Sequence, residues 1–486
     1  MAQTIQRFHP NAKPSGFIPS LSELCAICIG ENLDKVLAES TIPIPQWLLP
    51  LDEFGEKVPP EAEKQFISHF FLSPQSCWTR HFPIFIKSIP TDLDLSIAAL
   101  ALDDDRYWKA RCEATWTVTD CPKTLRYKNY YFERFISECI EQYADPFQKR
   151  NLLSQLSSEK HNHTLVSSSS NSKSLSKKIC EKQDLKPFHT KIVGQSEAGS
   201  QAILDDMLML IMLFDIGAPF VSSLHIKQLP SHLHPILLIT HLTNLISLSV
   251  RYSPLSSGMT YSASDSEEGP TATDCQRWRE ALPQSHLTSL CLSNNSLQNK
   301  HVKILSFGLL ENRTITQLDI SHNELSYDAL NSLSQCLHPK SNPILSVLNL
   351  ENNKFGSDCG NLFGLILAHN KSLTVLNLKL NALKDEGILA MCRGLTENTT
   401  LTSLNISSNE ITVASIATLL QALRNHPTLR SLDISCNDLH GAPKKLFVEA
   451  LNGDVLRMID VRNTHLSASD EEEILSIGRE KMKEVG

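Results

Sequence analysis

The stretch LTVLNLKLNAL, residues 373–383, decides the fold of this protein. It follows the pattern L-x-x-L-x-L-x-x-N-x-L, and the same pattern recurs with Leu, Ile or Phe at its apolar places. The further copies lie at residues 287–297, 315–325, 345–355, 401–411 and 429–439, with a degenerate copy at 456–466 and a weaker one, LISLSV, beginning at Leu245. Self-similarity at a period of about 28 residues is the signature of a repeat architecture.

Each repeat is expected to supply one strand and one helix. Alternating apolar residues such as Leu376 and Leu378 predict a strand with one buried face. Beyond the asparagine the apolar spacing changes to four, as in Met391 and Leu395, which predicts a helix. The asparagines at the ninth place are expected to bond backbone groups that would otherwise be buried without a partner. These are Asn295, Asn323, Asn353, Asn381, Asn409 and Asn437.

This alternation of strand and helix resembles the ribonuclease-inhibitor class of leucine-rich repeats. The resemblance implies an α/β solenoid over residues 242–466, with parallel strands on a concave side and helices on a convex side. Because a single repeat cannot close a core, stacking of neighbouring repeats is expected to stabilise the domain. Residues 467–486 are expected to form a C-terminal cap helix and tail.

The first half of the chain has no such repeat and is expected to form separate parts. Residues 1–20 are expected to be a disordered N-terminus, and residues 21–156, with helical patterns between prolines, predict an all-α N-terminal domain. Residues 157–200 hold eleven serines and seven lysines, which predicts a disordered linker. The apolar stretch at residues 201–241, interrupted by prolines, predicts a helical cap for the solenoid.

The composition argues against several classes of function. With 45 Lys and Arg against 53 Asp and Glu among 486 residues, the formal net charge is -8, which opposes non-specific binding of nucleic acid. The densest apolar run, residues 207–214, is far shorter than the roughly 20 residues that span a membrane. The N-terminal residues lack the apolar core of a signal peptide. The 13 cysteines, an odd number, are expected to be reduced intracellular thiols.

No pattern in the sequence predicts an enzyme, a cofactor or a metal site. Motifs for phosphate-binding loops, nucleophile elbows and zinc proteases are absent from the sequence. The one C-x-x-C pair, Cys25 and Cys28, has no second pair at zinc-finger distance. Two cysteines on one side of a buried helix are therefore expected instead of a structural zinc site, which needs four ligands.

The expected helical domain also contains an aromatic cluster that includes Tyr107, Trp108 and Trp116. Arg111 lies among these residues and is expected to stack on Trp108 or Trp116. Most clusters of this kind are core, so we expect a structural role for it.

The side chains on the concave side predict where a partner binds. Because places four and six of each repeat face the core, places three, five and seven are expected to face solvent. Seven strands at about 4.8 Å spacing give a polar strip on the order of 30 Å long, which suits a protein partner. The candidate binding residues are Asp319, Asn349, Glu351, Asn377, Lys379, Asn405, Asp433, Asp460 and Arg462. The alternative, that Asn and Asp at place five are typical of this repeat class and only solvate the surface, stays open for each residue.

Motifs outside the regular repeats resemble one family in particular. They are L-x-E-L-C at residues 21–25, DRYWKARC at 105–112, FER at 132–134, a degenerate first repeat that ends at Met259, and LNLKLNALKDEG at 376–387. In this order they resemble the T-complex-associated testis-expressed family, the leucine-rich-repeat subunit five of the nexin-dynein regulatory complex. The resemblance spans residues 21–466. The chain departs from the family in lacking a long N-terminal extension and in its Ser-rich insert at residues 157–200.

The resemblance implies a non-enzymatic scaffold subunit in the axoneme of motile cilia and flagella, where it supports the regulation of dynein-driven motility. The implied partners are other subunits of this complex and neighbouring axonemal proteins. No nucleic acid, membrane, small-molecule substrate or cofactor is implied, and the implied location is the cytoplasm and cytoskeleton of the cilium or flagellum.

Two other classes of protein share this repeat type. The first is a regulator of a small GTPase, because Ran GTPase-activating proteins carry such repeats and an acidic tail; here the acidic run is only residues 470–473. The second is an inhibitor or innate-immune-type sensor. The lack of a nucleotide-binding motif argues against a sensor.

Overall fold

The computed structural model describes residues 91, 95, 98, 99, 102–143, 210–229, 233–252, 269–338, 344–453 and 455–483. The chain divides into two compact units, Met1–Tyr131 and Phe132–Gly486. The expected N-terminal tail at residues 1–20, the expected linker at 157–200 and the Cys25 and Cys28 pair lie outside the described residues.

The first unit contains helix α7 (Asp105–Thr115), which carries the aromatic cluster. Trp108 is fully buried, and Arg111 is 6% exposed. The guanidinium carbon of Arg111 lies 5.8 Å from the ring centroid of Trp108 and 5.2 Å from that of Tyr131. The expected stacking of Arg111 in a core is therefore confirmed, with Trp108 as one of the rings.

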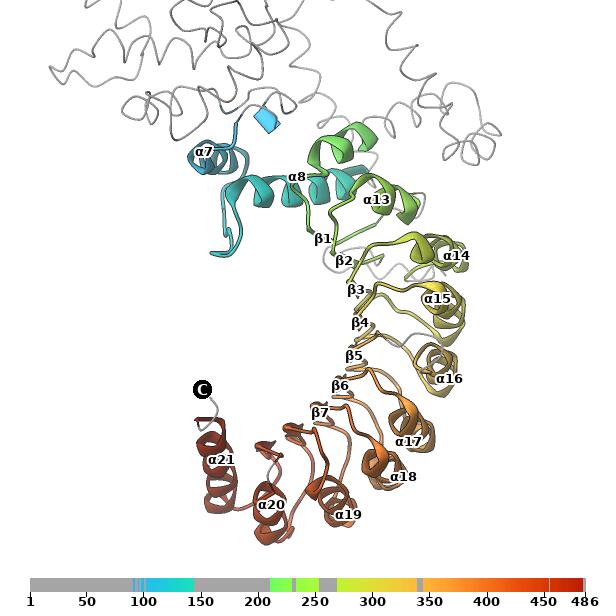
Figure 1. Cartoon of the computed structure of the whole chain (residues 1–486), viewed down its shortest axis with the longest axis vertical. Coiled ribbons are helices and arrows are strands. Elements are labelled where there is room, and N and C mark those ends of the chain that lie inside the picture. The colour runs from blue at the N-terminus through green and yellow to red at the C-terminus, as the bar shows by residue number, and fades with distance from the viewer. Residues whose placement is uncertain are drawn as a thin grey trace, which may run out of the picture. The chain divides into compact units, whose positions relative to one another are not determined.

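The second unit is a solenoid whose strands form one parallel sheet (Figure 1). In the described part of the chain, nine strands lie side by side in sequence order. They are β1 (Ser223–Ile226), β2 (Ser247–Val250), β3 (Ser289–Cys291), β4 (Gln317–Asp319), β5 (Val347–Asn349), β6 (Val375–Asn377), β7 (Ser403–Asn405), β8 (Ser431–Asp433) and β9 (Met458–Asp460).

Helices connect the strands and lie on the outer side of the curve, while the strands lie on its inner side (Figure 1). They are α13 (Pro235–His241), α14 (Ala272–Ala281), α15 (Asn299–Glu311), α16 (Tyr327–Cys336), α17 (Gly360–His369), α18 (Lys384–Glu397), α19 (Val413–Arg424) and α20 (Lys444–Leu451), with short 3-10 helices at Leu282–Gln284 and Ser357–Cys359. The expected α/β solenoid with parallel strands on its concave side is confirmed.

The apolar places of the repeat form the core between sheet and helices. Leu376 pairs in register with Leu348 on one side and Leu404 on the other, so that place four stacks from strand to strand. Leu376 is 2% exposed, and Leu378 at place six is completely buried. Each such leucine contributes about 1.5–3 kcal/mol when it is fully removed from water.

The ninth-place asparagines bond buried backbone groups of their own repeat and the preceding one. The Asn381 amide nitrogen donates to the carbonyls of Leu378 at 3.0 Å and Leu350 at 3.1 Å, and its oxygen accepts from the Phe355 N–H at 3.2 Å. The expected role of this column is therefore found in the structure. The other members, which make equivalent bonds, are Asn295, Asn323, Asn353, Asn409 and Asn437.

A second column of buried asparagines lies where the outer helices end. Asn370 is 1% exposed; its oxygen accepts from the Leu373 N–H at 2.6 Å, and its amide donates to the Leu337 carbonyl of the preceding repeat at 2.7 Å. Asn312 and Asn398 make the same two kinds of bond and are completely buried. This column connects successive repeats on the helical side, as the ninth-place column does near the strands.

His426 occupies the same position in the next repeat. Its Nδ1 accepts from the backbone N–H groups of Thr428 and Leu429 at 3.3 and 3.0 Å. Its Nε2 is buried and has no hydrogen-bond partner in the described part of the chain. In the three repeats with a buried asparagine at this position, the amide nitrogen donates a hydrogen bond instead. Burial lowers the pKa of His426.

The N-terminal end of the sheet differs from the expected helical cap at residues 201–241, because β1 lies in that range and pairs with β2. The repeat pattern did not predict this strand, because Leu229 occupies the ninth place, where later repeats have asparagine. An edge strand exposes unpaired N–H groups. Here the Glu133 Oε1 accepts from the N–H groups of Ser222 at 3.1 Å and Ser223 at 2.9 Å.

These contacts come from helix α8 (Tyr127–Tyr143), inside which the boundary between the two units falls. Phe132 stacks on Phe220 with ring centroids 4.9 Å apart, and the Glu141 Oε1 accepts from the Lys227 N–H at 2.7 Å. Phe132, Glu133 and Glu141, which belong to the expected helical domain 21–156, therefore pack with the solenoid. Phe132 and Glu133 of the FER motif close its first strand.

At the C-terminal end, helix α21 (Ala468–Lys483) packs against β9 and α20. The Lys444 ammonium of α20 pairs with Asp470 at 3.1 Å and Glu473 at 2.7 Å. The expected C-terminal helix is thus present, and its acidic first turn is fixed to the preceding helix.

Three further observations concern only the residues that the structure describes. Their helices include none that is both long and apolar enough to cross a membrane. The nine cysteines among them are free thiols. No group of three or more His, Cys, Asp or Glu side chains among them is placed to hold a metal ion.

Candidate interaction surface

The last residue of each strand from β4 to β9 is an asparagine or aspartate whose side chain shapes the turn that follows. The Asn349 and Asn377 oxygens each accept the backbone N–H two residues ahead, at 3.1 Å in both cases. Asp319, Asn405, Asp433 and Asp460 make the same bond at 2.9 to 3.1 Å. This is an Asx turn, which Asn and Asp favour. Place five therefore has a structural role in every one of these repeats.

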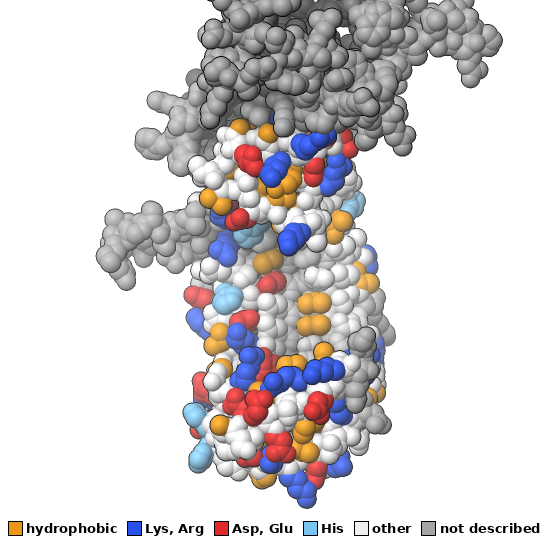
Figure 2. Space-filling model, turned by 90° about the vertical axis from the view of Figure 1, so that its left-hand side faces the viewer, with side chains coloured by type: hydrophobic (Ala, Val, Ile, Leu, Met, Phe, Trp, Pro, Cys, Tyr) orange, Lys and Arg blue, Asp and Glu red, His pale blue; other side chains and the backbone are white. Residues whose placement is uncertain are grey.

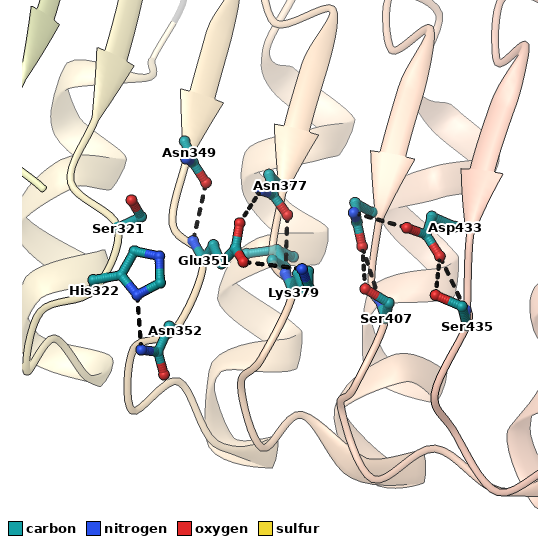
Figure 3. Close-up of polar contacts among 12 residues, drawn as sticks. Ser321, His322, Asn349, Glu351, Asn352, Asn377, Lys379, Ser407, Asp433 and Ser435 are labelled. Carbon is teal, nitrogen blue, oxygen red and sulfur yellow. Dashed lines mark hydrogen bonds and ion pairs between the residues drawn. The ribbon is translucent and has the colours of Figure 1, made fainter. Parts of the chain in front are cut away.

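Three of the predicted residues form one cluster across neighbouring repeats. The Glu351 carboxylate accepts from the Asn377 amide at 3.0 Å and lies 3.2 Å from the Lys379 ammonium nitrogen (Figure 3). The side chains of Glu351 and Lys379 are 19% and 40% exposed. Because both remain partly in water, the pair contributes only about 0–1 kcal/mol to stability.

A second cluster joins the next two repeats. The Asn405 amide donates to the second carboxylate oxygen of Asp433 at 3.0 Å, while Ser407 and Ser435 donate their hydroxyls to the Asn405 and Asp433 oxygens at 2.8 and 2.7 Å. Each carboxylate and amide oxygen in this cluster is thus held in a fixed orientation.

Asp460 and Arg462 form a separate pair on the last strand. Two nitrogens of the Arg462 guanidinium contact the two carboxylate oxygens of Asp460. Asp460 is 5% exposed, and burial alone would raise its pKa, but the hydrogen bonds from Arg462 outweigh burial and hold the pKa below its usual value. The aspartate is therefore charged at neutral pH.

Asp319 and Asn349 are less connected than the others. The Asp319 carboxylate accepts from the Ser321 N–H and hydroxyl, at 2.9 and 2.6 Å. Within the described ranges, neither Asp319 nor Asn349 bonds to the side chain of another predicted residue. The structure therefore brings the nine residues into two clusters and one terminal pair, with two members apart.

Sequence reasoning missed the row of eighth-place residues along the rim of this strip. His322 and Asn352 adopt left-handed backbone angles, with φ of 54° and 51°, and their side-chain nitrogens lie 2.9 Å apart (Figure 3). Asparagine adopts this conformation more readily than most residues. An Asn pair at places eight and nine, as in residues 352–353, was the available signal.

The strip is a fixed polar surface with charges of both signs. Figure 2 faces the side of the molecule that lies to the left in Figure 1, and on it Asp, Glu, Lys and Arg side chains gather mainly in the lower, C-terminal part. Because neighbouring repeats already hold these side chains in place, a partner that docks here pays little entropy for ordering them. The arrangement fits protein binding better than proton transfer, since the acids are engaged by amides, hydroxyls and cations.

The repeat region matches a family model described as Leucine Rich repeat at residues 311–334, 369–392, 397–419 and 425–442. Together with the parallel inner strands and outer helices, this match shows that the repeat region has the leucine-rich-repeat fold. The chain is similar to dynein regulatory complex subunit 5 of Chlamydomonas reinhardtii, with 30% identity over 222 residues. The expected resemblance to subunit five is thereby confirmed.

That similarity covers 45% of this chain and 42% of the relative. The chain is also similar to NACHT, LRR and PYD domains-containing protein 5 of Bos taurus, 33% identical over 113 residues, which is 23% of this chain and 10% of that protein. The chain thus spans less than half the length of either relative.

Among solved structures, the actin-binding site 2 of leiomodin-1 matches with a TM-score of 0.27 and 21% identity, over 32% of this chain and 92% of that one. The Rad7 and Elc1 complex of yeast matches with a TM-score of 0.29 and 15% identity, over 53% of this chain and 74% of that one. With TM-scores this low, the fold assignment depends on the chain's own strands, helices and repeat pattern.

Proposed function

We propose that this chain is a non-enzymatic scaffold subunit of the nexin-dynein regulatory complex in the axoneme of motile cilia and flagella. There it supports the regulation of dynein-driven motility by binding other subunits and neighbouring axonemal proteins. The observation that carries the proposal is the similarity to dynein regulatory complex subunit 5 over 222 residues.

The concave strip supports a scaffold role. Its clusters around Glu351 and Asp433 and its terminal pair of Asp460 and Arg462 are held by bonds between neighbouring side chains. A solenoid presents such a surface over many repeats, and its stability does not depend on the occupant. A subunit that connects other proteins needs a large, rigid surface on which they can bind.

The FER motif also supports a scaffold role. Phe132 and Glu133, which contribute to the family resemblance, close the first strand of the sheet through Phe220, Ser222 and Ser223. Closing that edge stabilises the solenoid and leaves the concave strip available to a partner.

A tagged full-length chain expressed in cells with motile cilia tests this proposal. We expect the tag in detergent-extracted axonemes, and we expect other regulatory-complex subunits to precipitate with it after salt extraction. A chain that stays in the detergent-soluble fraction and precipitates none of these subunits would contradict the proposal. Stimulation of GTP hydrolysis by a purified small GTPase would favour the GTPase-regulator class instead.

A further inference from the structure

The second place of most repeats carries a hydroxyl residue that bonds the preceding repeat. The Thr374 hydroxyl donates to the Ser346 carbonyl at 3.0 Å, and the Thr402 hydroxyl donates to the Thr374 carbonyl at 2.9 Å. Thr288, Thr316 and Ser346 make the equivalent bond at 3.1 to 3.4 Å. A small hydroxyl side chain therefore meets the structural demand at this place.

The last two repeats have arginine there. Arg430 and Arg457 directly precede β8 and β9, and the Arg457 N–H donates to the Arg430 carbonyl at 3.0 Å, so the two residues are neighbours where these adjacent strands begin. The side chain of Arg430 is exposed and makes no hydrogen bond or ion pair within the described residues. The arginines thus replace a structural residue without taking over its bond.

Arg457 connects this site to the end of helix α21. One of its terminal nitrogens donates to the Lys481 carbonyl at 3.4 Å, and its Nε is buried without a hydrogen-bond partner among the described residues. The Lys481 ammonium donates to the carbonyls of Leu451 and Gly453, and Lys483 is basic in the same last turn. In the described part of the chain, none of these four cations has an acidic partner.

Other cations at this end of the molecule are neutralised. Lys444 pairs with Asp470 and Glu473, and Arg479 pairs with Glu472 at 2.7 Å. Among the described residues, Arg430, Arg457, Lys481 and Lys483 therefore carry positive charge that no acidic side chain pairs with, in a protein whose formal net charge is -8. We call these four residues the C-terminal basic patch.

We propose that the C-terminal basic patch binds an acidic segment of a protein partner. Adjacent strands lie about 4.8 Å apart, so the two guanidinium groups can each meet a carboxylate of one extended acidic segment. Four cations suit a short run of carboxylates. The negative net charge of the whole chain disfavours a long nucleic-acid polyanion. This proposal does not depend on the axonemal assignment, because the purified chain suffices to test it.

Fluorescence anisotropy with a labelled oligoglutamate peptide measures the interaction on the purified full chain. The first variant is Arg430→Thr with Arg457→Thr, which installs the threonine of the other repeats and is expected to keep the fold. We expect it to weaken peptide binding by about tenfold or more, because each charge-assisted hydrogen bond lost is a strong one. A second variant, Arg430→Thr with Lys483→Gln, changes positions near the surface and is expected to weaken binding as well.

The matched control removes two positive charges elsewhere, by Lys303→Gln with Lys371→Gln, both exposed. It should bind the peptide as the wild-type chain does. Unchanged affinity in both folded patch variants, or an equal loss in the control, would overturn the proposal. Tighter binding of a polyuridylate strand than of oligoglutamate, lost in the same patch variants, would also overturn it in favour of nucleic acid.

Discussion

The Lys379 ammonium nitrogen lies 3.2 Å from a carboxylate oxygen of Glu351, so two charges expected to face a partner neutralise each other across adjacent repeats. The Asn377 amide occupies the other carboxylate oxygen at 3.0 Å. A partner therefore meets an oriented cluster of side chains and not two mobile charges. This changes how substitutions at these positions must be designed.

Reversing one charge of this pair should destabilise the fold slightly, and reversing both should restore most of the loss. We expect Glu351→Lys alone and Lys379→Glu alone to lower the free energy of unfolding by about 0.2–1 kcal/mol, because each puts like charges side by side. The double variant again places opposite charges there, and chemical denaturation of all three measures the coupling. Three variants as stable as the wild type would show that the pair contributes nothing to the fold.

Asn381→Ala should lower the free energy of unfolding by more than the small change in side-chain volume suggests. It leaves the Phe355 N–H and the carbonyls of Leu350 and Leu378 without the amide that bonds them. We expect a loss of about 1–3 kcal/mol in the free energy of unfolding. Asn361→Ala, at an exposed position of α17, is the control and should change stability by less than about 0.5 kcal/mol. Equal effects of the two substitutions would contradict the role given to the ninth-place column.

The repeat could be predicted from sequence because its strand, turn and helix signals are local and recur. Leu376 and Leu378 show the strand face directly. The role of Asn370 could not be predicted, because its amide bonds a carbonyl of the preceding repeat, Leu337, and that contact appears only once the repeats are stacked. The contact of Glu133 with Ser222 joins residues far apart in the chain, and no periodic pattern encodes it.

The sequence predicted which side of the sheet the candidate residues lie on, but not the hydrogen bonds that their side chains make. Asp319 and its equivalents were expected to face solvent, and the alternative that Asn and Asp at place five are typical of this repeat class and only solvate the surface was left open. The Asx turn that each one forms gives these positions a structural reason for Asn or Asp. Which partner docks on them stays a prediction.

His426→Asn should reduce the pH dependence of stability. Burial lowers the pKa of His426 in the folded state, so the unfolded chain takes up the proton more readily, and folded stability falls as the pH drops below about 6.5. Asparagine does not titrate and is the residue found at this position in four other repeats, at residues 312, 342, 370 and 398. Thermal melts at about pH 5 and pH 7.5 should differ less for this variant than for wild type. His369→Asn, at an exposed helix end, should leave the difference unchanged; a similar reduction there would contradict the assignment to His426.

Glu133→Ala should loosen the first strand of the sheet. It removes the acceptor for the Ser222 and Ser223 N–H groups, and we expect a loss of about 1–3 kcal/mol and faster hydrogen exchange of these two amides. Glu133→Gln keeps an acceptor oxygen and should lose less. Glu113→Ala on α7 breaks the exposed Lys109 pair and should cost only about 0.3–0.5 kcal/mol. Slow exchange of both amides in Glu133→Ala would rule out the proposed edge closure.

The central claim is that the concave strip docks onto another axonemal subunit, and incorporation of a charge-swapped chain tests it most directly. Glu351→Lys with Lys379→Glu keeps the ion pair but inverts its direction, and a mismatched charge at an interface can cost several kcal/mol. The control swaps an ion pair on helix α20, by Lys445→Glu with Glu449→Lys, whose nitrogen and oxygen lie 3.6 Å apart. Each tagged chain is then quantified in detergent-extracted axonemes. We expect the concave swap to lower retention of the folded chain while the α20 swap is retained at the wild-type level; retention of both at that level would contradict the claim.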